Sequence, residues 1–386
     1  MNRGRLYSAW CLTLGLLFFA GLAGTAVWGM IQPDREKSER ENRMLRQFPA
    51  FTLDSAADGR FMNRLEDYLT DQFPARDRLV SAKTYLDLLC GKKKINGVWI
   101  GRDGWLIEDQ PPLRETQLKG LTDAIRRFCE QNPSVRAATV LAPNASYMLA
   151  DRLPYGAPLY DQKEVLDRIR ADLGTSCGWI DCVSVLRQAP PEEPLYYRTD
   201  HHWTTQAAYR VFCRLAEEWK LDAASQTYSF VTASDCFQGT LASSSGVRHI
   251  HDTLTLCAPR GAEGSYTVSY ESEQRTTVTC FDRAAMQRRN QYEVFLGGNF
   301  DKIVITTTAC NDDTLLLLKD SYANCMIPML TPYFHRIVVV DPRYFNDTVE
   351  GCMQDERVTH VLFLYNLNTF LQDQSLADVL DAAPAA

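Results

Sequence analysis

From residue 115 onward, short apolar runs alternate with segments that have helical spacing of apolar residues. The apolar runs are AATVLAPN (137–144), DKIVITTT (301–308), DTLLLLKDS (313–321), HRIVVVDPRYF (335–345) and RVTHVLFLYNLNTF (357–370). The helical segments are 116–132, 164–174 and 204–220. Leucine and β-branched runs between helices are typical of strands buried on both faces. The sequence therefore predicts a three-layer α/β domain with a parallel sheet over residues 115–386.

Two other parts of the chain depart from this pattern. Residues 224–282 are rich in Ser, Thr and Gly and have few helical stretches, which predicts a β-rich insertion in the α/β domain. Residues 34–114 are expected to hold juxtamembrane helices and a hairpin. Pro74 separates two helical patterns there, and GVWIGRDGWLIE (97–108) predicts a hairpin that turns at Asp-Gly.

The N-terminal segment 1–33 contains an uncharged apolar run at residues 8–30. A helix of this length can cross a hydrocarbon core of about 30 Å. Arg3 and Arg5 precede the run, so the positive-inside rule places the N-terminus in the cytoplasm and the body outside. A cleavable signal peptide is the alternative, with LAGTA (22–26) as a weak cleavage site. We therefore expect a single-pass cell-membrane protein with an extracytoplasmic domain, or a secreted one if the segment is cleaved.

Composition restricts the functional classes further. The formal net charge is −7, which argues against a nucleic-acid partner because binding phosphates requires a basic face. None of the twelve cysteines forms a C-x-x-C pair with zinc spacing. Cys177 and Cys182 are close enough in sequence for a small disulfide loop. No metal and no cofactor is predicted.

The stretch LLLLKDSYAN (315–324) has the layout of a nucleophile after a strand. In open α/β sheets, reactive groups gather beyond the carboxyl ends of the strands. Ser321 follows the apolar run and precedes a predicted amphipathic helix, whose free N–H groups can hold an oxyanion. The simpler alternative is that Ser321 only caps that helix.

A nucleophilic serine needs a base, and YYRTDHHW (196–203) offers one. Residues two positions apart in extended chain point to the same side, so Asp200 and His202 are expected to share a face and His201 to point away. Asp200 would then fix the tautomer of His202. In the alternative without chemistry, Asp200 caps the following helix. A metal site is the other rival, with ligands at the positions Asp200, His202, His249 and His251.

Several motifs carry a resemblance to a known family. They are YYRTDHHWT (196–204) with QAAY (206–209), GGN (297–299), KDSYAN (319–324), VVVDPRYF (338–345), ENRML (41–45), DQFPARD (71–77) and GVWIGRDGWLIE (97–108). As a set they resemble the bacterial DHHW family of exported proteins, over roughly residues 36–370. That family is in turn similar to the alginate O-acetyltransferases of the SGNH-hydrolase-like class, which carry an Asp-x-His-Trp motif and a later serine.

The resemblance implies roles for individual residues. Asp200 becomes the orienting carboxylate, His202 the base and Ser321 the nucleophile. Their order in the chain matches the circularly permuted layout of the acetyltransferases, although Lys319-Asp320 stands where ordinary SGNH members have Gly-Asp.

The remaining candidates would hold the oxyanion or the substrate. The backbone N–H of Ser321 or Tyr322 is one choice for the oxyanion, and Asn299 and Asn366 are others because SGNH enzymes use an asparagine beside a glycine. Tyr197 could present a stacking face to a sugar. Trp203 would wall the site or pack against the next helix.

The resemblance implies an extracytoplasmic serine O-acetyltransferase or acetylesterase that acts on cell-surface or exopolysaccharide. Export of the catalytic domain would require a membrane partner to deliver an acyl group made in the cytoplasm. Two alternatives remain from the sequence: a glycan-binding surface protein with a vestigial triad, and a metal-dependent hydrolase.

Overall fold

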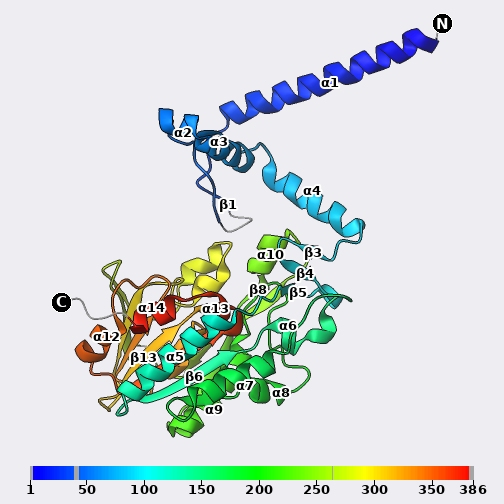
Figure 1. The fold of residues 1–386 in the computed structure, drawn as a ribbon. Helices are drawn as coiled ribbons and strands as arrows, with labels where there is room; N and C mark the ends of the chain where they lie inside the picture. The colour runs from blue at the N-terminus through cyan, green and yellow to red at the C-terminus, as the bar shows by residue number, and fades with distance from the viewer. Residues whose placement is uncertain (1–2, 39–42, 263, 382–386) are drawn as a thin grey trace. The chain divides into compact units, whose positions relative to one another are not determined.

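The computed structural model describes residues 3–38, 43–262 and 264–381, and it divides into two compact units (Figure 1). The first unit spans Met1–Lys92 and the second spans Lys93–Ala386. The hairpin that the sequence grouped with the juxtamembrane helices therefore belongs to the second unit.

The first unit is mostly helical. Its elements are α1 (Arg3–Ile31), β1 (Lys37–Ser38), β2 (Arg43–Met44), α2 (Leu53–Ala57), α3 (Arg60–Asp71) and α4 (Arg76–Leu89). Within α1, the stretch Tyr7–Ile31 is long and apolar enough to cross a membrane, and none of its most apolar stretch is buried in the protein. Such a helix is compatible with a signal anchor or a signal peptide. The helices α3 and α4 lie on either side of Pro74, as predicted.

The second unit opens with a small three-stranded sheet. This sheet has the order β3 (Lys94–Ile95), β4 (Val98–Ile100), β5 (Leu106–Glu108), with η1 (Arg102–Gly104) as the turn. The pairing of β4 with β5 is antiparallel, as expected for the predicted hairpin. Asp103 and Gly104 both adopt positive φ, 53° and 79°, which explains the Asp-Gly pair at this turn.

The main sheet of this unit has eight strands in the order β11-β10-β12-β14-β13-β15-β6-β7. Their bounds are β6 (Arg136–Ala142), β7 (Gly178–Ile180), β10 (Tyr266–Tyr270), β11 (Arg275–Thr277), β12 (Lys302–Thr307), β13 (Thr314–Lys319), β14 (Arg336–Val340) and β15 (His360–Asn366). The five strands from β14 to β7 are parallel, whereas β12, β10 and β11 are antiparallel to their neighbours. The sheet is therefore mixed, and the expectation of a parallel sheet is wrong at this edge. Periodicity could not reveal this, because a buried strand reads the same in either direction.

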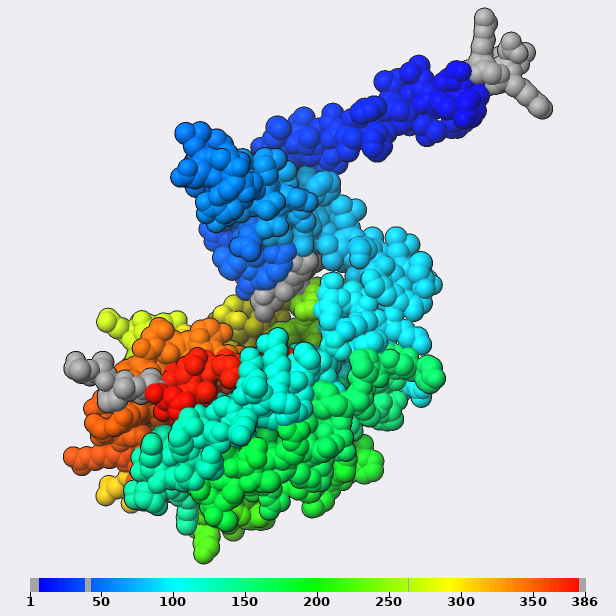
Figure 2. Space-filling model, viewed as in Figure 1, coloured from blue at the N-terminus to red at the C-terminus, as the bar shows by residue number. Residues whose placement is uncertain are grey.

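Helices cover both faces of the sheet and complete the three predicted layers. One layer contains α5 (Glu115–Gln131), α7 (Gln162–Leu173), α12 (Val349–Asp355), α13 (Leu367–Gln372) and α14 (Ser375–Asp381). The other contains α9 (Thr205–Trp219) and α11 (Ile327–Leu330). Figure 2 shows α5 and α14 side by side on the surface of this unit. Along β13, Leu315 and Leu317 face the α9 layer while Leu316 and Leu318 face the α5 layer, so the leucine run is buried on both sides.

The remaining short elements lie in the connections. They are α6 (Ala145–Met148), η2 (Ala150–Arg152), α8 (Cys182–Arg187), η3 (Ala223–Ser225), η4 (Arg283–Gln287), η5 (Gln291–Val294) and η6 (Ser321–Ala323). Cys177 and Cys182, which sequence spacing made a candidate disulfide, both carry free thiols. The Cys177 thiol instead lies 3.1 Å from the hydroxyl of Thr139.

The predicted β-rich insertion is divided between two structures. Its first part is a separate two-stranded sheet of β8 (Tyr228–Phe237) and β9 (Asp252–Pro259), with α10 (Thr240–Ser245) between them. Its second part supplies β10 and β11 to the edge of the main sheet. The segment therefore both extends the sheet and adds a structure beside it.

Candidate active site

The loop 196–203 is a closed turn rather than an extended strand. Tyr196 and Trp203 form an antiparallel bridge at its base, and the backbone N–H of Tyr197 donates to the carbonyl of His202. The helix α9 begins at Thr205 with Thr204 as its N-cap, so Asp200 does not cap this helix. The loop can therefore present the Asp200 side chain to its own histidines.

Asp200 and His202 are joined by the turn and not by strand alternation. The Oδ1 atom of Asp200 accepts both the backbone N–H of His202, at 3.0 Å, and its ring Nδ1, at 2.5 Å. The expectation that His201 points away is wrong for the same reason, because the tight turn brings the two imidazole centroids to 4.0 Å.

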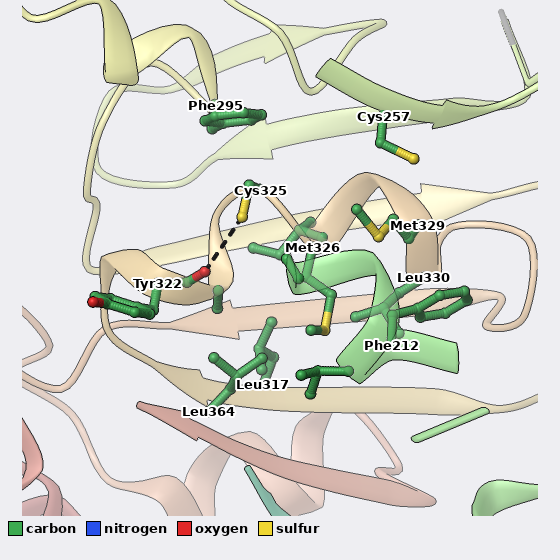
Figure 3. Close-up of a cluster of buried hydrophobic side chains, with 14 of the residues drawn as sticks. Phe212, Cys257, Phe295, Leu317, Tyr322, Cys325, Met326, Met329, Leu330 and Leu364 are labelled. Atoms are coloured by element: carbon green, nitrogen blue, oxygen red, sulfur yellow. Dashed lines mark hydrogen bonds between the residues drawn. The ribbon is translucent and has the colours of Figure 1, made fainter. Parts of the chain in front are cut away.

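Ser321 lies beyond the carboxyl end of β13, which pairs in parallel with β14 on one side and β15 on the other. Its Oγ atom is 2.8 Å from the Nε2 atom of His202. The predicted amphipathic helix after it is wrong: η6 and α11 are short and largely buried among apolar side chains (Figure 3). Asp320, and not Ser321, caps η6, because its carboxylate accepts the N–H of Tyr322.

The electrostatic environment favours a neutral base beside an ionised carboxylate. Burial and the neighbouring His201 lower the pKa of His202 to about 4, which outweighs the opposite effect of Asp200. Burial alone would raise the pKa of Asp200. The positive charge that His202 and His201 can carry, together with hydrogen bonds from His202 and Thr240, instead holds this pKa well below its usual value. At neutral pH His202 therefore has a free lone pair for the serine proton.

A glycine allows the start of α10 to approach Asp200. The Oδ2 atom of Asp200 accepts the backbone N–H of Thr240 at 2.7 Å and its hydroxyl at 3.1 Å. A Cβ atom on Gly239 would come within 2.0 Å of Oδ2, so only glycine fits there. Asp252 at the start of β9 accepts the N–H groups of Arg198 and Thr199. The segment between β8 and β9 thus fixes the loop that carries Asp200 and His202.

Under the serine lies a buried charge network. Lys319 is the last residue of β13, and Asp341 comes directly after the adjacent strand β14. The Nζ atom of Lys319 lies 3.2 Å from the Oδ2 atom of Asp341. Arg343 donates to both oxygens of Asp341, at 2.8 and 2.6 Å. Burial lowers the pKa of Lys319, whereas Lys319 and Arg343 lower that of Asp341 against its own burial. The lysine at this position therefore points into the protein and leaves the Ser321 hydroxyl free to meet His202.

The network also orients one candidate oxyanion donor. The Oδ1 atom of Asn299 accepts from Lys319 Nζ at 3.0 Å and from Asn324 Nδ2 at 3.1 Å, so its own Nδ2 group points away from both. The N–H of Tyr322 is committed to Asp320, which removes it from the candidates. In residues 264–381, the described part of the chain around the serine, no acceptor is found for the N–H of Ser321. Ser321 N–H and Asn299 Nδ2 are the donors that remain.

Three other residues that the sequence suggested for the site, Tyr197, Trp203 and Asn366, are buried in the core. Tyr197 and Trp203 have 2% and 0% of their surface exposed, and the Trp203 indole donates to the carbonyl of Tyr322. Asn366 is also buried, and its Oδ1 accepts from Asn144 Nδ2 and from the backbone N–H of Asn368. The N–H of Asn366 donates to Asp320, which ties the end of β15 to the residue before Ser321. Their residue types suggested ligand contact, but the burial of each position depends on the tertiary fold.

The metal alternative has a different set of ligands from the predicted one. In the described residues, the one group of three candidate ligands is Asp200, His201 and His202, without His249 or His251. Nδ1 of His201 lies 2.7 Å from Thr240 Oγ1, Nδ1 of His202 lies 2.5 Å from Asp200 Oδ1, and Nε2 of His202 lies 2.8 Å from Ser321 Oγ, so these three ring nitrogens already have protein oxygens as hydrogen-bond partners. These lone pairs and protons are arranged for hydrogen bonds, so the residues present do not favour a metal.

The sequence did not indicate two residues that contact the site. One contacts the His202 ring, and the other contacts the Asp200 carboxylate. The phenol ring of Tyr292, from η5, stacks on His202 with centroids 3.8 Å apart and an interplanar angle of 11°. Thr240 bonds both Asp200 and His201. Gly239-Thr240 at the start of a helical segment was the available signal, whereas nothing in the sequence around Tyr292 indicated the contact.

The three-layer α/β scaffold is that of the SGNH-hydrolase-like class. Residues 98–285 match the family described as the SGNH hydrolase-like domain of acetyltransferase AlgX. This range includes Asp200 and His202 and ends before Ser321. The resemblance and the α/β class predicted from the sequence are thereby confirmed.

Solved structures share the fold. A DHHW family protein from Eubacterium siraeum has a TM-score of 0.62 and 21% identity, and the alignment covers 76% of this chain and 98% of that one. PatB1 from Bacillus cereus, solved with a sulfonyl adduct, has a TM-score of 0.59 and 20% identity, with 71% of this chain and 97% of that one covered. Among curated proteins no match to the chain is found.

Proposed function

We propose that the protein is an extracytoplasmic serine-dependent O-acetyltransferase or acetylesterase that modifies cell-surface or exopolysaccharide. The observation that carries the proposal is the hydrogen-bond chain from Asp200 Oδ1 to His202 Nδ1, at 2.5 Å, and from His202 Nε2 to Ser321 Oγ, at 2.8 Å. The match of residues 98–285 to an acetyltransferase family supports acyl transfer as the reaction type.

In the first half-reaction, Ser321 Oγ attacks the carbonyl carbon of an acetyl donor and its proton passes to His202 Nε2. Asp200 holds the imidazolium that forms. In this proposal the N–H of Ser321 and the Nδ2 of Asn299 donate to the oxyanion. When the tetrahedral intermediate collapses, the donor oxygen leaves with the proton from His202, and Ser321 carries an acetyl ester.

In the second half-reaction, a sugar hydroxyl attacks the acetyl carbonyl while His202 accepts its proton. Collapse of this second intermediate releases the acetylated sugar, and the proton returns from His202 to Ser321 Oγ. Attack by water in place of the sugar gives acetate, which makes the same site an esterase. These steps require no metal and no nucleotide.

The apolar helix α1 supports the proposed extracytoplasmic location. As a signal anchor this helix would hold the catalytic unit outside the cytoplasm, next to polysaccharide at the cell surface. An acetyl donor made in the cytoplasm would then reach the site through a membrane partner. The solved PatB1 carries a sulfonyl adduct, so a sulfonyl fluoride is a suitable probe for covalent labelling here.

The test compares acetate release and acetyl transfer from 4-nitrophenyl acetate in Ser321→Ala and Ser134→Ala. Ser134 is an exposed serine just before β6, at the opposite edge of the sheet from the site. We expect Ser321→Ala to lose at least about 10³-fold in rate and all sulfonyl labelling, as removal of a triad member does. Ser134→Ala should retain both. Undiminished activity in Ser321→Ala would refute the proposal.

A further inference from the structure

The second histidine of the doublet, His201, lies beside the base at the edge of the site. Its ring centroid is 4.0 Å from that of His202, and the two planes are tilted by 35°. The side chain of His201 is 27% exposed, whereas that of His202 is 5% exposed. An imidazole that touches the base and also faces solvent is well placed to contact a bound substrate.

The hydrogen bonds of Thr240 fix the tautomer of His201. The Oδ2 atom of ionised Asp200 can only accept, so the single hydroxyl proton of Thr240 goes to it, over 3.1 Å. The Oγ1 atom of Thr240 must then accept from its other neighbour, Nδ1 of His201, at 2.7 Å. The proton of a neutral His201 therefore sits on Nδ1, and Nε2 carries a lone pair.

Both imidazoles are thus held by the same carboxylate. Nδ1 of His202 donates to Oδ1 of Asp200 directly, and Nδ1 of His201 reaches Oδ2 through Thr240. Since each ring turns its Nδ1 toward Asp200 and the rings overlap, each turns its Nε2 away from the carboxylate. On His202 that atom meets Ser321, and on His201 it is a second hydrogen-bond acceptor.

We propose that His201 is an acceptor-binding residue, and that the two histidines together recognise a vicinal diol on the acceptor sugar. This inference rests on the proposed acyl transfer. The attacking hydroxyl gives its proton to Nε2 of His202, while the neighbouring hydroxyl donates a hydrogen bond to Nε2 of His201 and keeps its proton. A monohydric alcohol or water can fill only the first of these two positions.

The test measures how one acetyl-enzyme is partitioned between acceptors. The full-length protein is acetylated with 4-nitrophenyl acetate in the presence of trans-1,2-cyclohexanediol or cyclohexanol, and transfer to each alcohol is divided by hydrolysis in the same reaction. Because both products come from the same acetyl-enzyme, this ratio does not depend on the acylation rate. We expect the wild type to favour the diol, per hydroxyl, by about three- to tenfold, the effect of one hydrogen bond.

The variants separate His201 from its surroundings. His201→Ala should remove the preference for the diol. Thr240→Val should weaken it, because the imidazole loses the hydroxyl group that accepts its Nδ1 proton. Thr240→Ser keeps a hydroxyl group and should show the preference of the wild type. His251→Ala, at an exposed histidine whose carbonyl accepts from Arg198, is the matched control and should keep the preference. A wild type that does not favour the diol, or a His201→Ala variant that still does, would overturn the inference. A wild type that forms no acetyl-enzyme would instead overturn the proposed function.

Discussion

The Nε2 atom of His202 lies 2.8 Å from the Oγ atom of Ser321, although 119 residues separate the two in the chain. The loop before α9 supplies the imidazole, and the carboxyl end of β13 supplies the hydroxyl. Neither segment holds a complete site. The contact depends on the fold, which brings the loop over the centre of the parallel strands.

The acid limit of activity should reflect the lowered pKa of His202. A general base must be neutral, and an unperturbed imidazole, with a pKa of about 6.5, is largely protonated at pH 5. Burial and His201 lower the pKa of His202 to about 4, so the neutral form persists to lower pH. We expect the acid limb of kcat/KM for 4-nitrophenyl acetate to lie near pH 4. A limb near pH 6.5 would contradict this electrostatic account.

Asp200→Asn should reduce kcat by about 10⁴-fold, the loss that this change causes in the serine protease triad. An amide group that donates to Nδ1 would leave the His202 proton on Nε2, where it faces Ser321 and cannot accept. Circular dichroism should show an intact fold. The control is Asp235→Asn, at an exposed aspartate of β8, which should keep wild-type kcat. A loss below tenfold for Asp200→Asn would contradict the role of Asp200.

Gly239→Ala should damage the site although it adds a single methyl group. The new Cβ would lie 2.0 Å from Asp200 Oδ2, so α10 or the carboxylate must move and the bonds from Thr240 are lost. We expect a loss of kcat together with a lower midpoint of thermal unfolding.

Gly120→Ala provides the comparison, because Gly120 lies inside α5 and a Cβ atom added there would have no neighbouring atom within 4 Å. Alanine in a helix interior is favoured over glycine by about 0.5–1 kcal/mol, so this variant should be slightly more stable and fully active. Equal behaviour of the two variants would show that the close approach at Gly239 is unimportant.

Lys319 and Asp341 should be strongly coupled in stability. Lys319→Met leaves Asp341 buried with Arg343 as its remaining charged partner, at a cost of about 3 kcal/mol in the free energy of unfolding. Lys319→Met combined with Asp341→Asn should cost less than the sum of the two single changes. Urea unfolding of all three variants measures this coupling, and additive costs would contradict it.

An exposed ion pair serves as the reference for that comparison. Lys163 and Asp167 are one helical turn apart on α7, with Nζ 2.7 Å from Oδ1. Lys163→Met should cost no more than about 0.5 kcal/mol, because solvent screens this pair.

Local patterns predicted the parts of the fold that depend on neighbouring residues. The Pro74 break and the Asp103-Gly104 turn both act within a few residues, and the structure has each of them. The prediction that β12 runs parallel to its neighbours was wrong, because a buried apolar run such as KIVITT carries no information about its partner strands. The direction of a strand depends on which distant strands it pairs with, and the local patterns of a single sequence do not reveal that pairing.

The same distinction applies to the candidate site. Asp200, His202 and Ser321 have residue types and local settings that indicate chemistry, so the sequence selected them before any contact was known. Tyr292 has no such local signal, and the Gly239-Thr240 pair indicates at most the start of a helix. Only the fold brings Tyr292 to the His202 ring and Thr240 to the Asp200 carboxylate. An extended chain would turn His201 away from His202, whereas the turn in the loop brings the two rings together.

The central claim is that Ser321 carries the acyl group, and the most direct test is to identify the acylated residue. The full-length protein would be quenched in acid during turnover of 4-nitrophenyl acetate, digested, and its peptides analysed by mass spectrometry. The account predicts a mass increase of one acetyl group on the peptide that contains Ser321, and its absence in Ser321→Ala. An acetyl group on another residue, or none on wild-type protein that binds polysaccharide, would contradict the account and favour a glycan-binding protein without turnover.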